Sequence, residues 1–386
     1  MRRLRSGTIG RMNNPMSATI LGAGLLGRLL GVTLARAGWQ VELLEQAPDP
    51  ARAGGAARVA AAMLAPLAES AVTEPNVVVM GLYALPRWQA LCASLPQPVF
   101  FQRNGTLILW HRQDAREAHR FEALLRATAA RLGNLPEPEP LHAEQLAQRE
   151  PAVAGRFAQA LYLPGEGQLD GRAALDALLA ELHAHGAVVR WGVTTTLAEA
   201  ATAARASGHW VFDCRGLGAQ AEWPADGAAG SGPLRGVRGE VVRLYAPDVT
   251  LQRPTRLLHP RYPIYIAPKE RHVFVIGATE IEADDRSPAS VRSTLELLSA
   301  AYAVHPGFAE ARILELNTEC RPTLPDNLPA VRVRAPRVLQ LNGLYRHGYL
   351  IAPAVCDAVL QYVQEGHTTL AQQLGLTFVT PEAVTA

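Results

Sequence analysis

A glycine-rich turn between an apolar run and a leucine-rich segment constrains the fold of this chain more than any other feature of its sequence. The segment Gly22-Ala23-Gly24-Leu25-Leu26-Gly27 follows the apolar residues 18–21 and opens a stretch of leucines at helical spacing. In such a unit Gly22 permits a tight turn, Gly24 lets a pyrophosphate approach the backbone, and Gly27 lets helix and strand pack closely. The free N–H groups at the helix start attract phosphates. The segment predicts a Rossmann-type dinucleotide-binding unit.

An acidic residue stands where such a unit holds the ribose of its ligand. The expected second strand, 40–44, ends at Glu45, about twenty residues beyond the glycines. A carboxylate there accepts hydrogen bonds from ribose hydroxyls and disfavours a 2′-phosphate, so NADP is not expected. Because GxGxxG alone also occurs in ordinary loops, the prediction rests on strand, glycines, helix and acid together. A Rossmann scaffold that has lost its ligand is the alternative.

A second strand that ends in glycines favours FAD over NAD. The run 210–214 leads into Arg215-Gly216-Leu217-Gly218, far beyond the first nucleotide-binding segment. Two-domain flavoproteins return to the nucleotide sheet at such a point, whereas an NAD dehydrogenase has no need of it.

Other segments alternate between helical and extended patterns along the 386 residues, a length that suggests two or three domains. The Asn104-Gly105 pair is expected to close a hairpin between strands 99–102 and 106–110. The remaining strands are expected at 188–193, 240–245, 264–267, 273–278 and 338–341, and the helices at 56–68, 83–93, 114–133, 172–185, 291–304 and 353–365.

Charge and cysteine usage exclude several classes of protein. The formal net charge is +2, which gives no reason to expect nucleic acid or a membrane surface as a partner. The four cysteines lie far apart, which argues against a metal site and a disulfide framework. No apolar run reaches the roughly 18 residues that cross a bilayer. We expect a cytoplasmic enzyme without metal or membrane partner, and its homo-oligomeric state is open.

Further motifs occur in an order that a known family shares. The chain resembles the D-amino acid oxidase superfamily from Ala18 to about Glu365, and within it the glycine oxidases of thiamine biosynthesis. Two departures leave the substrate open: Glu280 stands where some members carry methionine, and Glu319-Cys320 stands where the residues are usually small and apolar. The matching motifs lie at 60–66, 104–107, 162–170, 235–240, 265–269, 276–279, 321–326 and 345–353.

The resemblance implies an α/β fold in which a Rossmann-type, glutathione-reductase-like FAD domain carries an inserted α+β substrate domain with an antiparallel sheet. The FAD domain is expected at 16–90, 150–228 and 322–370. The substrate domain is expected at 91–149 and 229–321. Residues 1–15 are expected to be a disordered extension or a wrongly assigned start.

Three residues are implied to contact the substrate. Arg321 resembles the family's carboxylate-binding arginine, and its planar guanidinium fork suits that ligand. The alternative for Arg321 is an ion pair with Asp326 or Glu319. Tyr265 could donate a second hydrogen bond or be a half-buried strand tyrosine. Arg346 is expected at the substrate or the flavin edge, with a purely structural role as the alternative.

Non-covalent FAD is the implied cofactor. The helix after the loop 343–351, with Pro353 near its start, is expected to point its N-terminus at the flavin C2 carbonyl. His347 is expected to be structural, because hydride transfer needs no general base, and Cys320 leaves covalent attachment as an alternative. The expected cofactor contacts are Gly22, Gly24, Leu25, Leu26, Gly27, Glu45, Ala62, Met63, Val193, Gly216, Arg346, His347, Gly348, Tyr349 and Leu350.

Three functions follow as hypotheses. The first is an oxidase of glycine, sarcosine or small D-amino acids that yields an imino acid and hydrogen peroxide, and that supplies dehydroglycine for thiamine thiazole synthesis. The second is a D-amino acid or N-methyl amino acid dehydrogenase with another electron acceptor. The third is a non-catalytic flavin-binding regulator.

Overall fold

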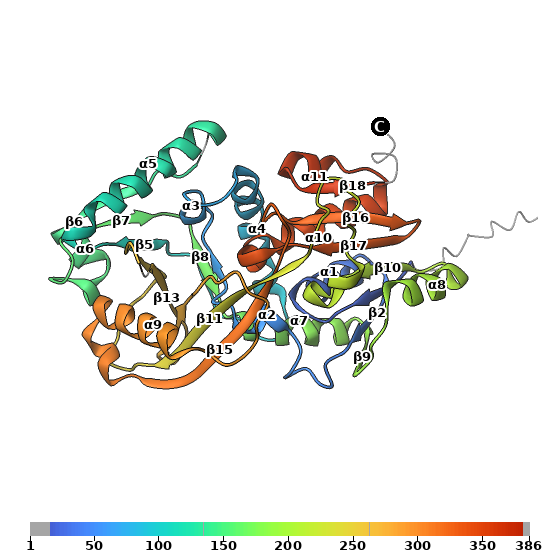
Figure 1. Cartoon of the computed structure of the whole chain (residues 1–386), viewed down its shortest axis with the longest axis horizontal. Coiled ribbons are helices and arrows are strands. Elements are labelled where there is room, and N and C mark those ends of the chain that lie inside the picture. Colours follow the sequence, from blue (N-terminus) through green and yellow to red (C-terminus); the bar gives the residue numbers. More distant parts are fainter. Residues whose placement is uncertain (1–15, 134, 262, 381–386) are drawn as a thin grey trace, which may run out of the picture.

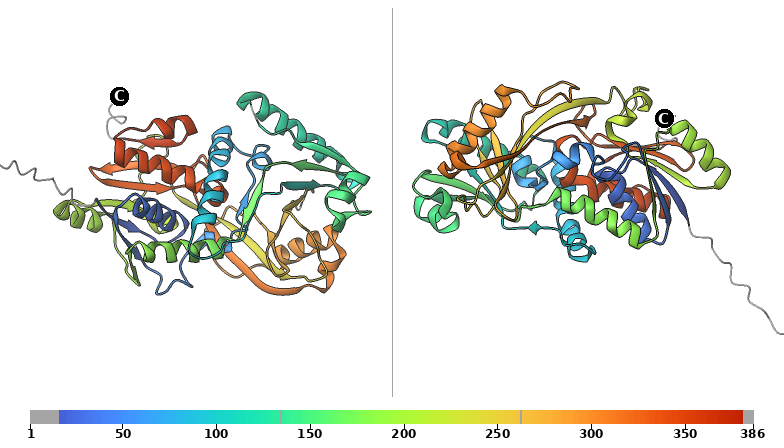
Figure 2. Two further views of the ribbon diagram at one scale, coloured as in Figure 1. Left: turned by 180° about the vertical axis from the view of Figure 1, so that it is seen from behind. Right: turned by 90° about the horizontal axis from the view of Figure 1, so that it is seen from below.

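The computed structural model describes residues 16–133, 135–261 and 263–380, so the expected extension 1–15 lies outside the described residues. Two large sheets occupy opposite halves of the molecule (Figures 1 and 2). The seven-stranded sheet has the order β18-β16-β17-β10-β1-β2-β9, and its pairs are parallel except β16 with β17. Its strands are β1 (Ser17–Leu21), β2 (Gln40–Glu45), β9 (Val188–Trp191), β10 (Trp210–Asp213), β16 (Ala330–Ala335), β17 (Val338–Asn342) and β18 (Thr377–Val379).

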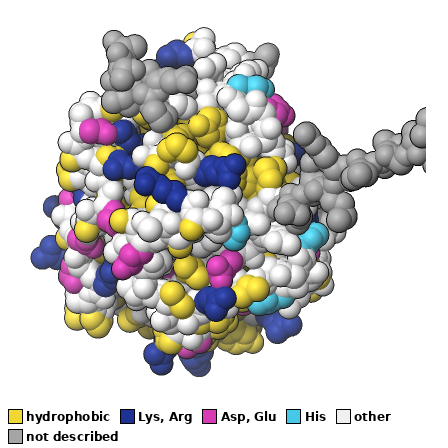
Figure 3. Space-filling view, turned by 90° about the vertical axis from the view of Figure 1, so that its right-hand side faces the viewer, with side chains coloured by type: hydrophobic (Ala, Val, Ile, Leu, Met, Phe, Trp, Pro, Cys, Tyr) yellow, Lys and Arg dark blue, Asp and Glu magenta, His cyan; other side chains and the backbone are white. Residues whose placement is uncertain are grey.

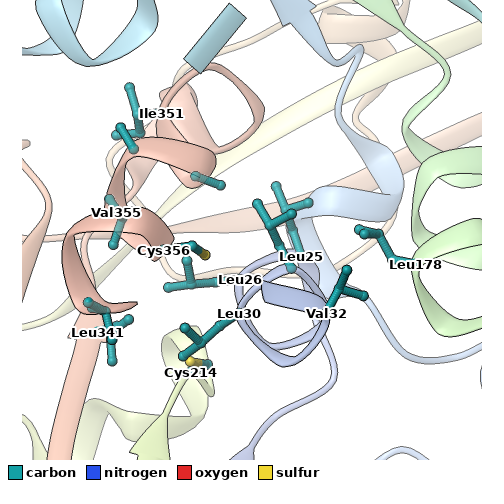
Figure 4. Packing of buried hydrophobic residues seen from close by; sticks show 14 of the residues in the cluster. Leu25, Leu26, Leu30, Val32, Leu178, Cys214, Leu341, Ile351, Val355 and Cys356 are labelled. Carbon is teal, nitrogen blue, oxygen red and sulfur yellow. The ribbon is translucent and has the colours of Figure 1, made fainter. Parts of the chain in front are cut away.

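Helices cover both faces of this sheet. Successive side chains of β1 point to opposite faces, and buried residues occur on both. Ile20 packs into the cluster beneath α1, α7 and α10, and the next residue, Leu21, packs beneath α8. Leu26 and Leu30 of α1 lie beside α10 in Figure 4. The helices of this half are α1 (Leu25–Arg36), α4 (Pro75–Ser94), α7 (Gly171–Ala184), α8 (Leu197–Ser207), α10 (Gly348–Glu365) and α11 (Thr369–Leu374).

The eight-stranded sheet has the order β15-β11-β14-β13-β12-β5-β7-β6, and its pairs are antiparallel except β12 with β5. Helix α9 (Val291–Val304) packs on β11, β13 and β14, and α5 (Ala115–Leu132) and α6 (Ala143–Arg149) complete this half. The strands are β5 (Thr106–Leu109), β6 (Glu139–His142), β7 (Gln159–Leu163), β11 (Arg235–Tyr245), β12 (Thr255–Leu257), β13 (Ile264–Pro268), β14 (Val273–Gly277) and β15 (Arg312–Thr323).

A small three-stranded sheet lies between the two halves. It has the order β3-β8-β4, with β3 at Met63–Leu64, β8 at Gly167–Leu169 and β4 at Phe101–Gln102. The short helices α2 (Gly55–Val59) and α3 (Pro66–Glu69) flank β3.

The α/β fold class with an antiparallel second sheet is confirmed, and the domain ranges stay a proposal. Pairing places β7 in the eight-stranded sheet, although the FAD domain was expected to contain 150–228. It also extends the seven-stranded sheet beyond residue 370 to β18. We propose the expected division with these two changes.

Three local predictions are wrong. The hairpin at Asn104-Gly105 does not form, because β4 pairs with β8 while β5 pairs with β7 and β12. The expected helix 56–68 is interrupted by the extended segment that contains β3, since its backbone pairs with β8.

The third error concerns the last long helix, which was expected to begin at Pro353. It begins at Gly348 and holds Pro353 in its interior. A proline within a helix leaves the carbonyl four residues earlier without its usual partner. That carbonyl, on Tyr349, accepts a hydrogen bond from the indole N–H of Trp88 at 2.6 Å. A neighbouring helix therefore supplies the donor that Pro353 lacks.

The surface at the seven-stranded end mixes charges of both signs (Figure 3). None of the helices in the described ranges combines the length and apolar character that a bilayer crossing requires.

Candidate active site

A cavity of about 1270 Å³ lies between the two large sheets. Its wall includes the ends of β1 and β2, the starts of α1 and α10, and parts of β11, β13 and β15. This volume exceeds the 300–1,000 Å³ typical of small-ligand pockets, so it has room for a long cofactor and a substrate. All the residues expected at the cofactor and substrate line it except Gly27.

The glycine turn has the shape that a pyrophosphate requires. A Cβ on Gly24 would meet no other heavy atom within 4 Å, so the space above this residue is open. Gly22 has a φ of +91°, and a Cβ on Gly27 would overlap the Gly22 carbonyl. Gly24 is also the N-cap of α1 and gives it no side-chain cap, which leaves N–H groups available to an anion. The chain's residues therefore fit the phosphates of FAD.

Glu45 holds this turn as well as facing the cavity. Its Oε2 accepts a hydrogen bond from the N–H of Ala23 at 2.6 Å, and its Oε1 accepts one from Ala47 at 2.9 Å. Each carboxylate oxygen has a second lone pair, so Glu45 retains acceptors for ribose hydroxyls. Arg28 was not predicted from the sequence, although its buried guanidinium donates to the Ala23 carbonyl at 2.7 Å.

The second helix N-terminus at the cavity is that of α10. Gly348, Tyr349 and Leu350 form its first turn and line the cavity. Its N-cap, His347, provides no side-chain cap. This end of α10 is therefore also open to a partly negative group.

Arg321 lines the cavity and is held in place by two backbone carbonyls. Its Nη1 donates to the Arg238 carbonyl at 3.2 Å and its Nη2 to the Thr279 carbonyl at 3.1 Å. A Cβ on Gly239 would overlap the guanidinium, so the glycine of β11 makes room for it. Within the described ranges no carboxylate forms an ion pair with Arg321, and Glu319 pairs with another arginine at 3.3 Å. The two carbonyls fix the guanidinium but leave its charge unpaired.

Tyr265 lies close to this arginine on β13. A Cβ on Gly277 would overlap its ring, so a second glycine makes room for the tyrosine. Burial raises the pKa of Tyr265, and the positive charge of Arg321 opposes that rise. The phenol therefore stays protonated at neutral pH and can donate a hydrogen bond.

Arg346 lines the cavity but is already paired. Its Nη2 lies 2.9 Å from Oε2 of Glu69, and its Nη1 lies 3.1 Å from Oε2 of Glu280. Glu69 in turn pairs with Arg256 at 2.6 Å. Burial would raise the pKa of Glu69, but Arg346 and Arg256 outweigh it and hold the pKa below its usual range. These four side chains form a network in which acids and arginines alternate, and the sequence did not reveal it.

His347 is buried beside this network. Its Nδ1 lies 3.5 Å from Oε2 of Glu69, and its Nε2 lies 3.4 Å from the hydroxyl of Thr73. Burial lowers the pKa of His347 to about 4, despite the opposing charge of Glu69. The ring is therefore neutral at pH 7 and adds no cation to the cavity.

Lys269, the single lysine of the sequence, ends the matching motif 265–269, but no role was predicted for it. Its buried Nζ donates to the carbonyls of Ala61 and Leu169, each at 2.8 Å, and to Oε1 of Gln168 at 2.9 Å. It thereby ties the cavity-lining segment that contains Ala61 to β8. The motif 265–269 marked this position in the sequence, but the contacts of its lysine follow only from the fold.

We expect Lys269 to make stability depend on pH. Burial lowers its pKa from 10.5 to about 7, so between these values the unfolded chain binds more protons than the folded one. The free energy of unfolding should then rise with pH in this window, by up to about 1.4 kcal/mol per unit, and Lys269 should add no slope below pH 7. Urea unfolding at pH 7 and 9 checks this against Lys269→Met, which has no amine. From pH 7 to pH 9 the free energy of unfolding of the wild type should rise by roughly 2–3 kcal/mol more than that of the variant. An unchanged difference would show that the three acceptors keep the ammonium protonated.

The fold and the cavity together define a two-domain dinucleotide-binding oxidoreductase. The chain belongs to the family of FAD-dependent oxidoreductases abbreviated DAO, whose sequence model matches residues 17–362. Its cofactor is therefore FAD.

Individual relatives cover nearly the whole chain. A Rhizobium etli protein named for a thiamine biosynthesis oxidoreductase, ThiO, is 40% identical over 344 residues, 89% of this chain and 95% of its own length. A glycine oxidase of Geobacillus kaustophilus is 26% identical over 375 residues, 92% of this chain and 95% of its own. Its crystal structure has a TM-score of 0.74 and 24% identity, covering 91% and 95% of the two chains. An iminodiacetate oxidase of Chelativorans also scores 0.74, at 20% identity with coverage of 94% and 99%.

Proposed function

We propose that this enzyme oxidises glycine or another small amino acid, such as sarcosine or a small D-amino acid, to the imino acid with release of hydrogen peroxide. The observation that carries the proposal is the unpaired guanidinium of Arg321, which faces the same cavity as the glycine turn and the start of α10. A small acid is the ligand that one such cation and a neighbouring phenol would select.

The roles of the residues follow from their positions. Arg321 binds the substrate carboxylate through its fork, and Tyr265 donates a hydrogen bond to it, so that Cα is held in one orientation. The amine reacts as its free base, and no side chain has to remove a proton from carbon. FAD, held by the glycine turn and the start of α10, would supply the hydride acceptor for Cα and the redox chemistry with oxygen. The protein's contribution is therefore orientation and charge neutralisation.

Thiamine biosynthesis is the pathway that the relatives favour. The 40% identity to the Rhizobium etli protein extends over nearly the whole of both chains, and that protein is named for this pathway. We propose that the imine formed from glycine serves thiazole synthesis. We further propose the site residues given above as the contacts of FAD and substrate.

Two measurements on the purified holoenzyme test the proposal. Glycine added without air should bleach the flavin absorbance, and readmitted air should restore it with one peroxide formed per glycine oxidised. Bleaching without peroxide at an enzymatic rate would indicate the dehydrogenase instead. If glycine, sarcosine and D-alanine all fail to bleach the flavin, the proposed reaction is wrong.

A further inference from the structure

The network that contains Arg346 ends on a carboxylate in the cavity. The order Arg256–Glu69–Arg346–Glu280 alternates in sign, with separations of 2.6, 2.9 and 3.1 Å. The Glu280 side chain is 47% exposed, whereas those of Arg346, Glu69 and Arg256 are 28%, 12% and 18% exposed. Glu280 is therefore the member most accessible to an incoming molecule.

The position of Glu280 relative to the proposed clamp is fixed by the backbone. The residue before it, Thr279, accepts the Nη2 hydrogen bond of Arg321 through its carbonyl, and its hydroxyl accepts one from the N–H of Glu240 at 2.8 Å. Burial and the neighbouring Glu280 raise the pKa of Tyr345, on the segment before α10, so the two side chains lie near each other. Glu280 is thus linked to Arg346 by its side chain and to Arg321 through the backbone of the residue before it.

Among the three arginines Arg256, Arg321 and Arg346, one has no carboxylate partner in the part of the chain that the structure describes. Arg256 and Arg346 are matched by Glu69 and Glu280, whereas Arg321 has no carboxylate partner in the described ranges. A substrate with one carboxylate can therefore be neutralised at Arg321. A second carboxylate that approached Arg346 would find its Nη1 engaged and would face the negative charge of Glu280, and such a like-charge contact disfavours binding.

From this arrangement we infer that Glu280 determines substrate specificity: by engaging Nη1 of Arg346 it restricts the site to amino acids with a single carboxylate. The inference rests on the proposed function, because it takes Arg321 as the site of the first carboxylate. Removal of the Glu280 charge would free one face of Arg346 and create a second anion position. The enzyme would then accept N-carboxymethyl amino acids such as iminodiacetate, which carry two carboxylates.

Binding of two unreactive ethers tests the inference. Methoxyacetate and diglycolate are the oxygen analogues of sarcosine and iminodiacetate, and they differ by one carboxylate. Calorimetry on the FAD-loaded wild type should show tighter binding of methoxyacetate. In Glu280→Gln the affinity for diglycolate should rise at least about tenfold while that for methoxyacetate stays within about threefold. Glu280→Met should show the same change in the two affinities. The double variant Glu280→Gln/Arg346→Met should not show the rise in affinity for diglycolate.

Glu319→Gln is the matched control. Glu319 also lines the cavity, but it pairs with Arg286 instead of Arg346. If loss of any cavity carboxylate raised diglycolate binding equally, a general change of field would explain the result and the inference would be overturned. If methoxyacetate binds but the ratio of affinities does not move in Glu280→Gln, this inference alone fails. If wild type binds neither ether, the carboxylate clamp of the proposed function fails with it.

Discussion

Gly24→Val should purify almost free of flavin, although its polypeptide should fold as the wild type does. A Cβ at this position meets nothing within 4 Å, and the backbone angles φ −74° and ψ −167° are open to any residue. The branched side chain would instead occupy the space above the turn, where the pyrophosphate of FAD has to approach. Released flavin, measured after denaturation, should fall from about one per chain to a trace.

The neighbouring glycine provides the contrast. Gly27→Val would place its Cβ on the Gly22 carbonyl, so this variant should fail to fold rather than fail to bind. Unfolding of the FAD-free proteins should therefore match for wild type and Gly24→Val. Only the wild type should gain stability when FAD is added, by about 2.7 kcal/mol at a hundredfold excess over Kd. Full flavin content in Gly24→Val would show that the phosphates lie elsewhere.

Arg321→Leu should lower kcat/KM for glycine at least about thirtyfold without altering the flavin spectrum. The loss corresponds to a charge-assisted contact of about 2–5 kcal/mol, part of which is the cost of an unpaired substrate carboxylate. Ethylamine has no carboxylate, so its oxidation should change much less. Steady-state rates of both amines on both proteins provide the measurement.

The structure adds a control to this experiment. Arg321 also donates to the carbonyls of Arg238 and Thr279, so its removal could disturb β11 and β15. Arg286→Leu removes a different arginine from the same cavity, one already neutralised by Glu319. It should leave the glycine rate within about threefold. Equal losses for glycine and ethylamine in Arg321→Leu would mean that Arg321 supports the fold and that the clamp lies elsewhere.

Features with a local cause could be predicted from the sequence. The turn at Gly22–Gly27, the helix after it and the acid at Glu45 depend on spacing within about twenty-five residues, and the structure has them in place. The helix 291–304 was likewise readable from its apolar pattern.

Features that depend on partners far apart in the chain could not be predicted from the sequence. The Asn104-Gly105 pair has the composition of a hairpin turn, and Gly105 does adopt a φ of +81°. The flanking strands β4 and β5 nevertheless belong to different sheets. Arg346 forms ion pairs with Glu69, which lies 277 positions earlier in the chain, and with Glu280, which lies 66 positions earlier. Which acid meets which arginine follows only from the packed fold, and a chain so rich in arginine offers many pairings.

The burial of Lys269 has a consequence for chemical labelling. Apart from an α-amino terminus, this residue provides the only primary amine of the chain, and its nitrogen is enclosed by three oxygen acceptors. Reagents that acylate amines should therefore modify it only in molecules whose central three-stranded sheet has opened. The rate of its acylation would report how often that sheet separates from the eight-stranded one, with one probe and no engineered site.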